Sequence, residues 1–126
     1  MVTAIKLTPE EMVIFRVAAR RRRERERREL AQREEEAWKL ARGAAMLLRK
    51  QFGATRVMVF GSLVHEGCFT PWSDVDIAAW GIALEDTFRA IGVVMDLSRG
   101  IEVNLVDVGA CSPLLRAAIE REGVEL

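Results

Sequence analysis

The sequence has few of the residues that build disulfide and zinc scaffolds. It holds only two cysteines, Cys68 and Cys111, and one histidine, His65, among 126 residues. Two isolated cysteines exclude a disulfide framework, and with one histidine they cannot form a familiar structural zinc set. No run approaches the ~18 apolar residues of a membrane span, and no basic-then-apolar leader opens the chain. We therefore expect a cytoplasmic protein without a membrane partner.

A net charge is also lacking, because 19 basic residues balance 19 acidic ones. The balance hides a strong asymmetry along the chain. Residues 1–50 hold 14 basic and 8 acidic residues, a charge of +6, whereas residues 51–126 hold 5 and 11, a charge of −6. Such a split indicates two regions with different roles. We predict a charged helical arm over residues 1–50 and a globular domain over residues 51–126.

The arm reads as one long helix from about Pro9 to Gln51. Thr8, Pro9 and Glu11 form a helix start with a capping box. The middle, residues 20–29, has no apolar face, and its interleaved glutamates would repel the phosphates that its arginines attract, so nucleic acid is not an expected partner. Oppositely charged residues four apart predict ion pairs along a solvated rod. These pairs are Arg20–Glu24, Arg22–Glu26, Glu24–Arg28 and Arg25–Glu29.

The two ends of this helix carry different apolar surfaces. Near residue 50, Trp38, Ala41, Ala45 and Leu48 form a broad stripe, which we expect to pack on the domain that follows. At the far end of the helix, an apolar patch surrounds Phe15. It lies too far from the domain over residues 51–126 to pack against its core. We therefore predict a homo-oligomer formed through the N-terminal helix. The patch consists of Met12, Phe15 and Ala19, flanked by Ile14 and Val17.

The second half alternates between strand and helix patterns. Strands are predicted over 55–60, 74–80 and 101–106, and helices over 84–97 and 113–122. The first of these helices is expected to use Leu84, Phe88, Ile91 and Met95 as its buried face. The order predicts an α/β (α+β) fold, with a small mixed β-sheet and flanking helices behind a long charged N-terminal helix.

Two groups of polar residues stand at the ends of neighbouring predicted strands. Asp74 and Asp76 open the second strand, and its period of two places both carboxylates on one face. Hard oxygen ligands of this kind suit Mg²⁺, which keeps water and phosphate oxygens in its shell. Gly61 and Ser62 follow the first strand, where free amides and a hydroxyl can cradle a phosphate. Together they predict a triphosphate anchor beside a divalent-metal site.

The segment from Val59 to Ile77, VFGSLVHEGCFTPWSDVDI, resembles the signature of polymerase-β-like nucleotidyltransferases. The length of the chain is similar to that of the minimal nucleotidyltransferases. The resemblance implies a nucleotidyltransferase fold and transfer of a nucleoside monophosphate, usually AMP from ATP, to a hydroxyl. It also implies nucleotide binding by Gly61, Ser62 and Ser73, and two Mg²⁺ ions held by Asp74 and Asp76.

The resemblance also implies a third carboxylate on the later strand, where this sequence has Asn104. Asparagine binds metal weakly and cannot act as a general base. Glu102, two residues earlier on the same face, is the candidate for that catalytic role. The alternative is a catalytically weak or inactive protein.

In the minimal family the partner is often a HEPN-domain protein, and the two form a toxin–antitoxin pair. The resemblance thus implies an antitoxin that adenylylates its partner. The other interpretation is a nucleotidyltransferase-fold binding module that neutralises the partner by contact.

Overall fold

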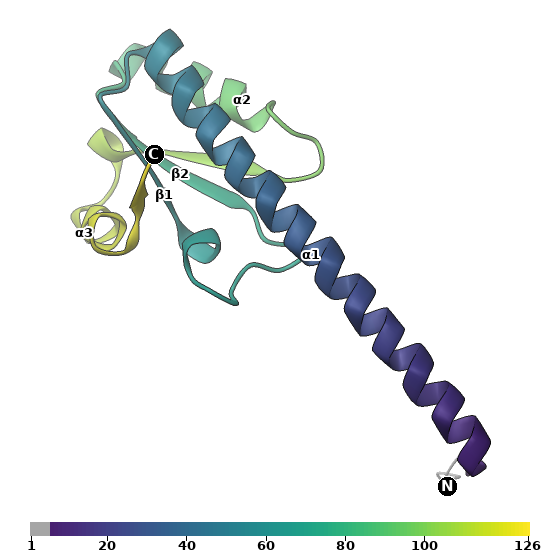
Figure 1. The fold of residues 1–126 in the computed structure, drawn as a ribbon. Helices are drawn as coiled ribbons and strands as arrows, with labels where there is room; N and C mark the ends of the chain where they lie inside the picture. Colours follow the sequence, from purple (N-terminus) through teal and green to yellow (C-terminus); the bar gives the residue numbers. More distant parts are fainter. Residues whose placement is uncertain (1–5) are drawn as a thin grey trace, which may run out of the picture. The chain divides into compact units, whose positions relative to one another are not determined.

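The computed structural model describes residues 6–126 (Figure 1). It divides the chain into two compact units, residues 1–32 and residues 33–126. Within the described residues, no helix combines the length and the apolar character needed to cross a membrane. The helices are α1 (Pro9–Phe52), α2 (Thr87–Met95) and α3 (Pro113–Glu122), and the strands are β1 (Arg56–Phe60), β2 (Val75–Trp80), β3 (Val103–Asp107) and β4 (Val124–Glu125).

Helix α1 begins at the predicted capping box. The Thr8 hydroxyl accepts a hydrogen bond from the Glu11 amide at 3.1 Å and donates one to Glu11 Oε1 at 3.0 Å. The helix then continues without a break to Phe52. The ion pairs predicted along its charged middle are not formed, because within residues 6–126 no arginine of the 20–29 segment lies within 4.0 Å of a carboxylate. Each such pair gains little in water and costs side-chain entropy.

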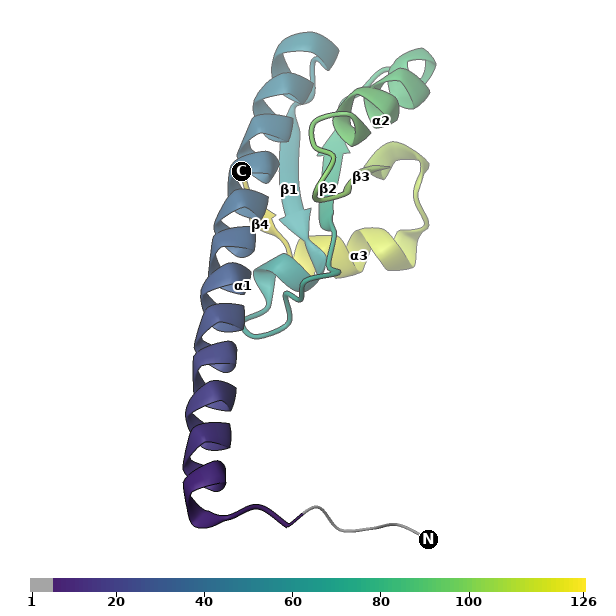
Figure 2. The ribbon, with the colours of Figure 1, turned by 90° about the vertical axis from the view of Figure 1, so that its right-hand side faces the viewer.

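The four strands form one mixed sheet in the order β3-β2-β1-β4. β1 is antiparallel to β2 and to the short β4, whereas β2 and β3 are parallel. The 59–77 segment therefore spans a strand, a turn and the start of the antiparallel neighbour. This arrangement brings the end of β1 beside the beginnings of β2 and β3 (Figure 2).

Helices cover both faces of the sheet. On one face, the end of α1 packs through small side chains, together with α2, on alternate residues of the three longer strands. The alanines of residues 37–45 let this part of the helix lie close to the sheet, and the larger Leu48 and Phe52 follow them. On the other face, Ile119 of α3 packs against Met58 and Ala78. The residues of α1 in the first cluster are Ala37, Ala41, Ala44, Ala45, Leu48 and Phe52.

The buried face of α2 differs from the predicted one. Leu84 and Phe88 are 77% and 88% exposed, and Met95 is also exposed. Ala90 and Val94, one turn apart, are fully buried instead. The chain over Leu84–Asp86 forms a 3-10 turn, and the α-helix begins only at Thr87. At about 100° per residue, Ala90 lies on the side of α2 opposite Phe88, so the buried side is not the one that carries the larger apolar residues.

The expected fold class is confirmed in its architecture. The unit over residues 33–126 is a small mixed sheet with flanking helices, and α1 is the long charged helix expected at the N-terminal side. The structure also contains β4, a two-residue strand that pairs with Met58 and Val59 and that periodicity did not indicate.

Candidate functional site

Three segments that are distant in sequence meet at one end of the sheet. Asp76 of β2 lies opposite Phe60, the last residue of β1, and opposite Asn104 of β3. Gly61 directly follows Phe60, and Asp74 directly precedes β2. The sheet register therefore brings together the glycine turn, the aspartate pair and the asparagine.

Gly61 and Asp76 are in close contact. Gly61 has a φ of +80°, which favours glycine, and a Cβ atom at this position would lie 2.6 Å from Asp76 Oδ2. No other residue can occupy the position without displacing the carboxylate. The glycine thus allows the Asp76 carboxylate to approach the backbone closely.

The Asp76 carboxyl group lies in an unfavourable environment for its charge. Burial raises the pKa of Asp76 above its usual value of 3.8, and the negative charge of Asp74 raises it further. A hydrogen bond from the Asn104 side chain acts in the opposite direction and stabilises the anion. Within residues 6–126, neither aspartate lies within 4.0 Å of a basic side chain. The pair therefore has an uncompensated negative charge that a cation would relieve.

The residues predicted to bind the nucleotide lie on both sides of this carboxylate pair. Ser62 is half-buried in the 3-10 turn Gly61–Val64 that follows β1. The Ser73 hydroxyl accepts a hydrogen bond from the Thr70 amide at 2.8 Å and lies 3.0 Å from the Thr70 hydroxyl. Ser73 thus closes the turn that leads into Asp74, and its side chain is already engaged within the loop.

Glu102 occupies the register position opposite Asp74, just outside β3. Its carbonyl oxygen accepts the Val75 amide at 2.9 Å, and the residue is exposed. Within the described part of the chain, no three acidic, histidine or cysteine side chains gather in one cluster. The geometry therefore assembles Asp74, Asp76 and Asn104, and it does not bring the Glu102 carboxylate into one cluster with the aspartates.

Asp107, the other acidic residue of β3, has a structural role. It accepts hydrogen bonds from the Thr87 hydroxyl at 2.7 Å and from the Gly109 amide at 3.1 Å. It lies three residues after Asn104 and therefore on the opposite face of the strand. The carboxylate links α2 to the end of β3 and takes no part in the site.

Arg33 of α1 is a residue that motif reasoning missed. Its guanidinium donates to the Ser73 carbonyl at 3.2 Å and to the Gly100 carbonyl at 3.0 Å, and it lies 6.0 Å from the centre of the Phe69 ring. One residue thus holds the loop before Asp74 and the loop before β3. The signal was present in the sequence, because Arg33 lies four residues before Ala37 and eight before Ala41, on the face that packs on the sheet.

The donor set fits a magnesium ion. Mg²⁺ is commonly held by one or two carboxylates, with water and phosphate oxygens completing its shell. Asp74 and Asp76 supply two such carboxylates, and Asn104 orients the second. Gly61 lets the Asp76 carboxylate lie directly against the backbone of the turn that follows β1.

Comparison with known proteins finds similar chains among the solved structures. No protein-family model matches the chain, and no curated protein matches it. A solved structure described as “putative minimal nucleotidyltransferase” is 28% identical in sequence, with a TM-score of 0.43. The match covers 79% of this chain and 94% of that one.

Proposed function

We propose that the protein is a Mg²⁺-dependent nucleotidyltransferase that transfers AMP from ATP to a hydroxyl group of a partner protein. The observation that carries the proposal is the contact of Gly61 with Asp76 beside Asp74, at the edge where β1, β2 and β3 meet. A pair of carboxylates without a basic partner favours a divalent cation. A glycine turn beside that pair favours a phosphate chain.

Each residue of the site would have a distinct role. Asp74 and Asp76 would hold two Mg²⁺ ions, which supply charge neutralisation of the triphosphate and activation of the acceptor hydroxyl. Gly61 and Ser62 would bind the β- and γ-phosphates through backbone amides and the hydroxyl. Asn104 would keep the Asp76 carboxylate oriented. Glu102, whose exposed side chain lies outside this cluster, would have to turn toward the aspartates to serve as the base for the acceptor.

The acceptor we propose is a HEPN-domain protein, with the present chain as the antitoxin of the pair. This part of the proposal rests on the resemblance of the 59–77 segment to minimal nucleotidyltransferases. Such a role in the cytoplasm requires a partner that presents a hydroxyl to the Asp74–Asp76 edge.

A second function is favoured by the composition of the site. Within residues 6–126 no third acidic side chain joins the aspartates, and Asn104 stands at the register position opposite Asp76. A site with two carboxylates can bind Mg²⁺–ATP without a group that deprotonates the acceptor. The protein would then be a binding module that neutralises its partner by contact.

Radiolabelled ATP distinguishes the two functions. The full chain is incubated with Mg²⁺, ATP labelled at the α-phosphate and candidate HEPN proteins, and label on the partner is measured after denaturing electrophoresis. We expect transfer that is lost in the double variant Asp74→Asn/Asp76→Asn. The matched control is Asp96→Asn, which removes an exposed carboxylate from the end of α2. Label transfer by the double variant at the control's rate would refute the site assignment.

Asn104→Asp separates an inactive enzyme from a wrong site. If the natural chain transfers no label and Asn104→Asp does, the third carboxylate is the missing group. If neither transfers label while the complex with the partner still forms, the binding-module function is correct.

Magnesium binding is tested without activity. Mg²⁺ at millimolar concentration should raise the melting temperature of the natural chain and leave that of Asp74→Asn/Asp76→Asn unchanged, because only the folded pair binds the ion.

A further inference from the structure

The N-terminal unit exposes an apolar surface that has no counterpart within the described part of that unit. Ile14 and Phe15 are 69% and 61% exposed, and four further apolar side chains of residues 7–17 are also exposed. A helix that is apolar on nearly all sides is normally buried against other elements. These further side chains are Leu7, Met12, Val13 and Val17.

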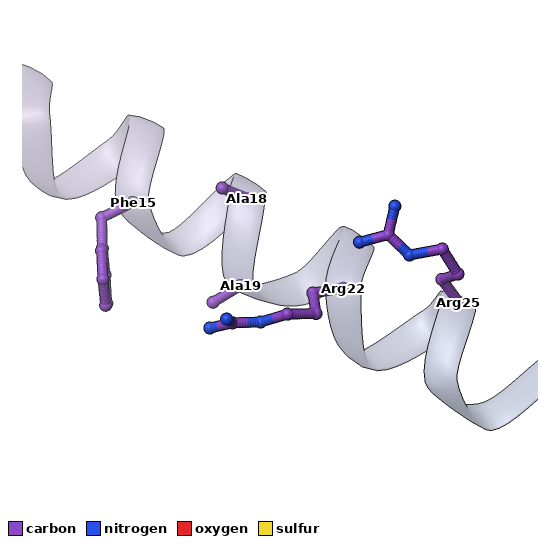
Figure 3. Close-up of a pocket in the computed structure, with 5 residues that line it drawn as sticks. All are labelled: Phe15, Ala18, Ala19, Arg22 and Arg25. Carbon is purple, nitrogen blue, oxygen red and sulfur yellow. The ribbon is translucent and has the colours of Figure 1, made fainter.

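One face of this helix has a shallow hollow of about 310 Å³. Figure 3 shows Phe15, Ala19 and Arg22 along one side of it, and Ala18 and Arg25 along the other. The two alanines leave space between a large aromatic ring and two guanidinium groups. An apolar knob from another helix would fill that space.

The same face follows a stripe with alternating spacings of four and three residues. Glu11, Phe15, Ala18 and Arg22 lie along it, which is the spacing of a helix–helix seam. If a second copy of the stripe is laid against the first in the opposite direction, Glu11 meets Arg22 and Phe15 meets Ala18. The stripe is thus complementary to itself in both charge and size.

A parallel arrangement of the two helices is electrostatically unfavourable. In a parallel pair, Arg22 would face Arg22 and Arg25 would face Arg25, and like charges placed together oppose association. Neither arginine lies within 4.0 Å of a carboxylate of its own chain within residues 6–126, so both are available to a partner. Glu11 Oε1 accepts the Thr8 hydroxyl, which leaves Oε2 for the partner's arginine.

We propose that two copies of this chain associate through residues 8–25 as an antiparallel helix pair. The two-fold axis passes near residues 16 and 17. Phe15 of each copy lies over Ala18 and Ala19 of the other, and Glu11 of each copy pairs with Arg22 of the other. Because the two copies use the same surface, the assembly closes as a dimer, and Val13 and Val17, on the side of Arg20, lie outside the contact.

Charge-reversal variants test whether a second copy of the chain binds this surface and whether the two helices are antiparallel. Sedimentation equilibrium of the full chain at micromolar concentration should show a dimer. Arg22→Glu or Glu11→Arg should each raise the dimer Kd at least tenfold. The double variant, or a mixture of the two single variants, should restore a Kd near that of the natural chain. Arg20→Glu is the matched control, because it makes the same charge change on the opposite face of the helix.

Cysteine crosslinking tests the register. In a Cys68→Ser/Cys111→Ser background, a mixture of Phe15→Cys and Ala18→Cys chains should form the mixed disulfide faster than either variant forms its own. Circular dichroism at 222 nm verifies that each variant keeps its helix, since Glu11→Arg also removes a capping contact.

Three results would overturn the proposal. The first is a monomer at all accessible concentrations, which would leave the surface to a different protein or a lipid surface. The second is a dimer that responds equally to Arg22→Glu and Arg20→Glu. The third is preferential crosslinking of Phe15→Cys with itself, which indicates parallel helices.

Discussion

At the scale of a single residue, Gly61 allows the Asp76 carboxylate to pack against the backbone of the turn. Its positive φ costs a residue with a Cβ atom about 1–2 kcal/mol, and the contact with Asp76 adds a steric demand. Gly67 offers a matched comparison, because its φ is +77° but nothing lies within 4 Å of its Cβ position. Substitutions at the two glycines therefore distinguish the effect of backbone strain from the effect of the steric contact with Asp76.

Alanine substitutions at Gly67 and Gly61 should differ in their effects on the free energy of unfolding and on the response to Mg²⁺. Gly67→Ala should lower the free energy of unfolding by about 1–2 kcal/mol and leave the Mg²⁺-induced rise in melting temperature intact. Gly61→Ala should lower the unfolding free energy further and abolish the response to Mg²⁺. Urea unfolding and thermal melts with and without the ion measure both effects. Equal losses, with the Mg²⁺ response retained in both variants, would show that Gly61 does not shape the site.

Asp76 supports a second prediction at this scale. Because burial raises its pKa in the folded state, the ionised form is stabilised less there than in the unfolded chain. Without Mg²⁺ at neutral pH, Asp76→Asn should therefore raise the unfolding free energy, by up to about 1 kcal/mol. The gain should shrink as pH falls through the carboxyl range, since Asp76 is then neutral in both states. A gain that grows toward acid pH would contradict the assigned direction of the pKa shift.

At the scale of elements, the helices and strands that have strong local sequence signals were the ones that could be predicted. The capping residues Thr8, Pro9 and Glu11 defined the start of α1, and Ser112 with Pro113 defined the start of α3. β4 gave no signal, because two residues have no periodicity and its pairing partner is more than sixty residues away. The face of α2 was predicted wrongly because its larger apolar side chains lie on the exposed side of the helix, whereas Ala90 and Val94 are fully buried.

The site was predictable to the extent that strand, turn and strand are adjacent in sequence. Gly61 and Asp76 come together through one antiparallel register, which the 59–77 segment contains entirely. The parallel pairing of β2 with β3 places Asn104, the residue that the family resemblance puts at the third carboxylate position, opposite Asp76. Arg33 could not be assigned to the site, because its partners lie 40 and 67 residues further along the chain.

Arg33 connects helix α1 with the two loops that lead to the candidate site. Hydrogen bonds from a charged group contribute about 1.5–3 kcal/mol, so Arg33→Ala should lower the unfolding free energy by that amount. It should also weaken Mg²⁺ binding, because the loops before Asp74 and before β3 lose their common anchor. Lys39→Ala, an exposed substitution one and a half turns further along α1, should change neither property. An Arg33→Ala chain with natural Mg²⁺ affinity would limit this residue to a purely stabilising role.

At the scale of the whole molecule, the zero net charge separates into opposite charges on the two compact units. Residues 1–32 hold 9 basic and 5 acidic residues, a charge of +4, and residues 33–126 carry the compensating −4. All residues of both buried clusters lie within 37–119, so the apolar core belongs entirely to the second unit. The candidate site lies in this unit as well, and the proposed association surface belongs to the first.

This separation predicts that assembly and folding can be uncoupled. A chain that begins at Gln32 should unfold cooperatively, with a free energy within about 1 kcal/mol of the full chain measured at a concentration where the full chain is monomeric. It should keep its Mg²⁺ response, because Arg33 and the Asp74–Asp76 edge are retained. It should remain a monomer at concentrations where the full chain associates, since residues 8–25 are absent. Chemical unfolding, thermal melts with Mg²⁺ and sedimentation equilibrium give the three readouts on one sample. If the shortened chain still associates as tightly as the full chain, its contacts lie in residues 33–126; if it fails to fold, the first unit contributes to the stability of the second.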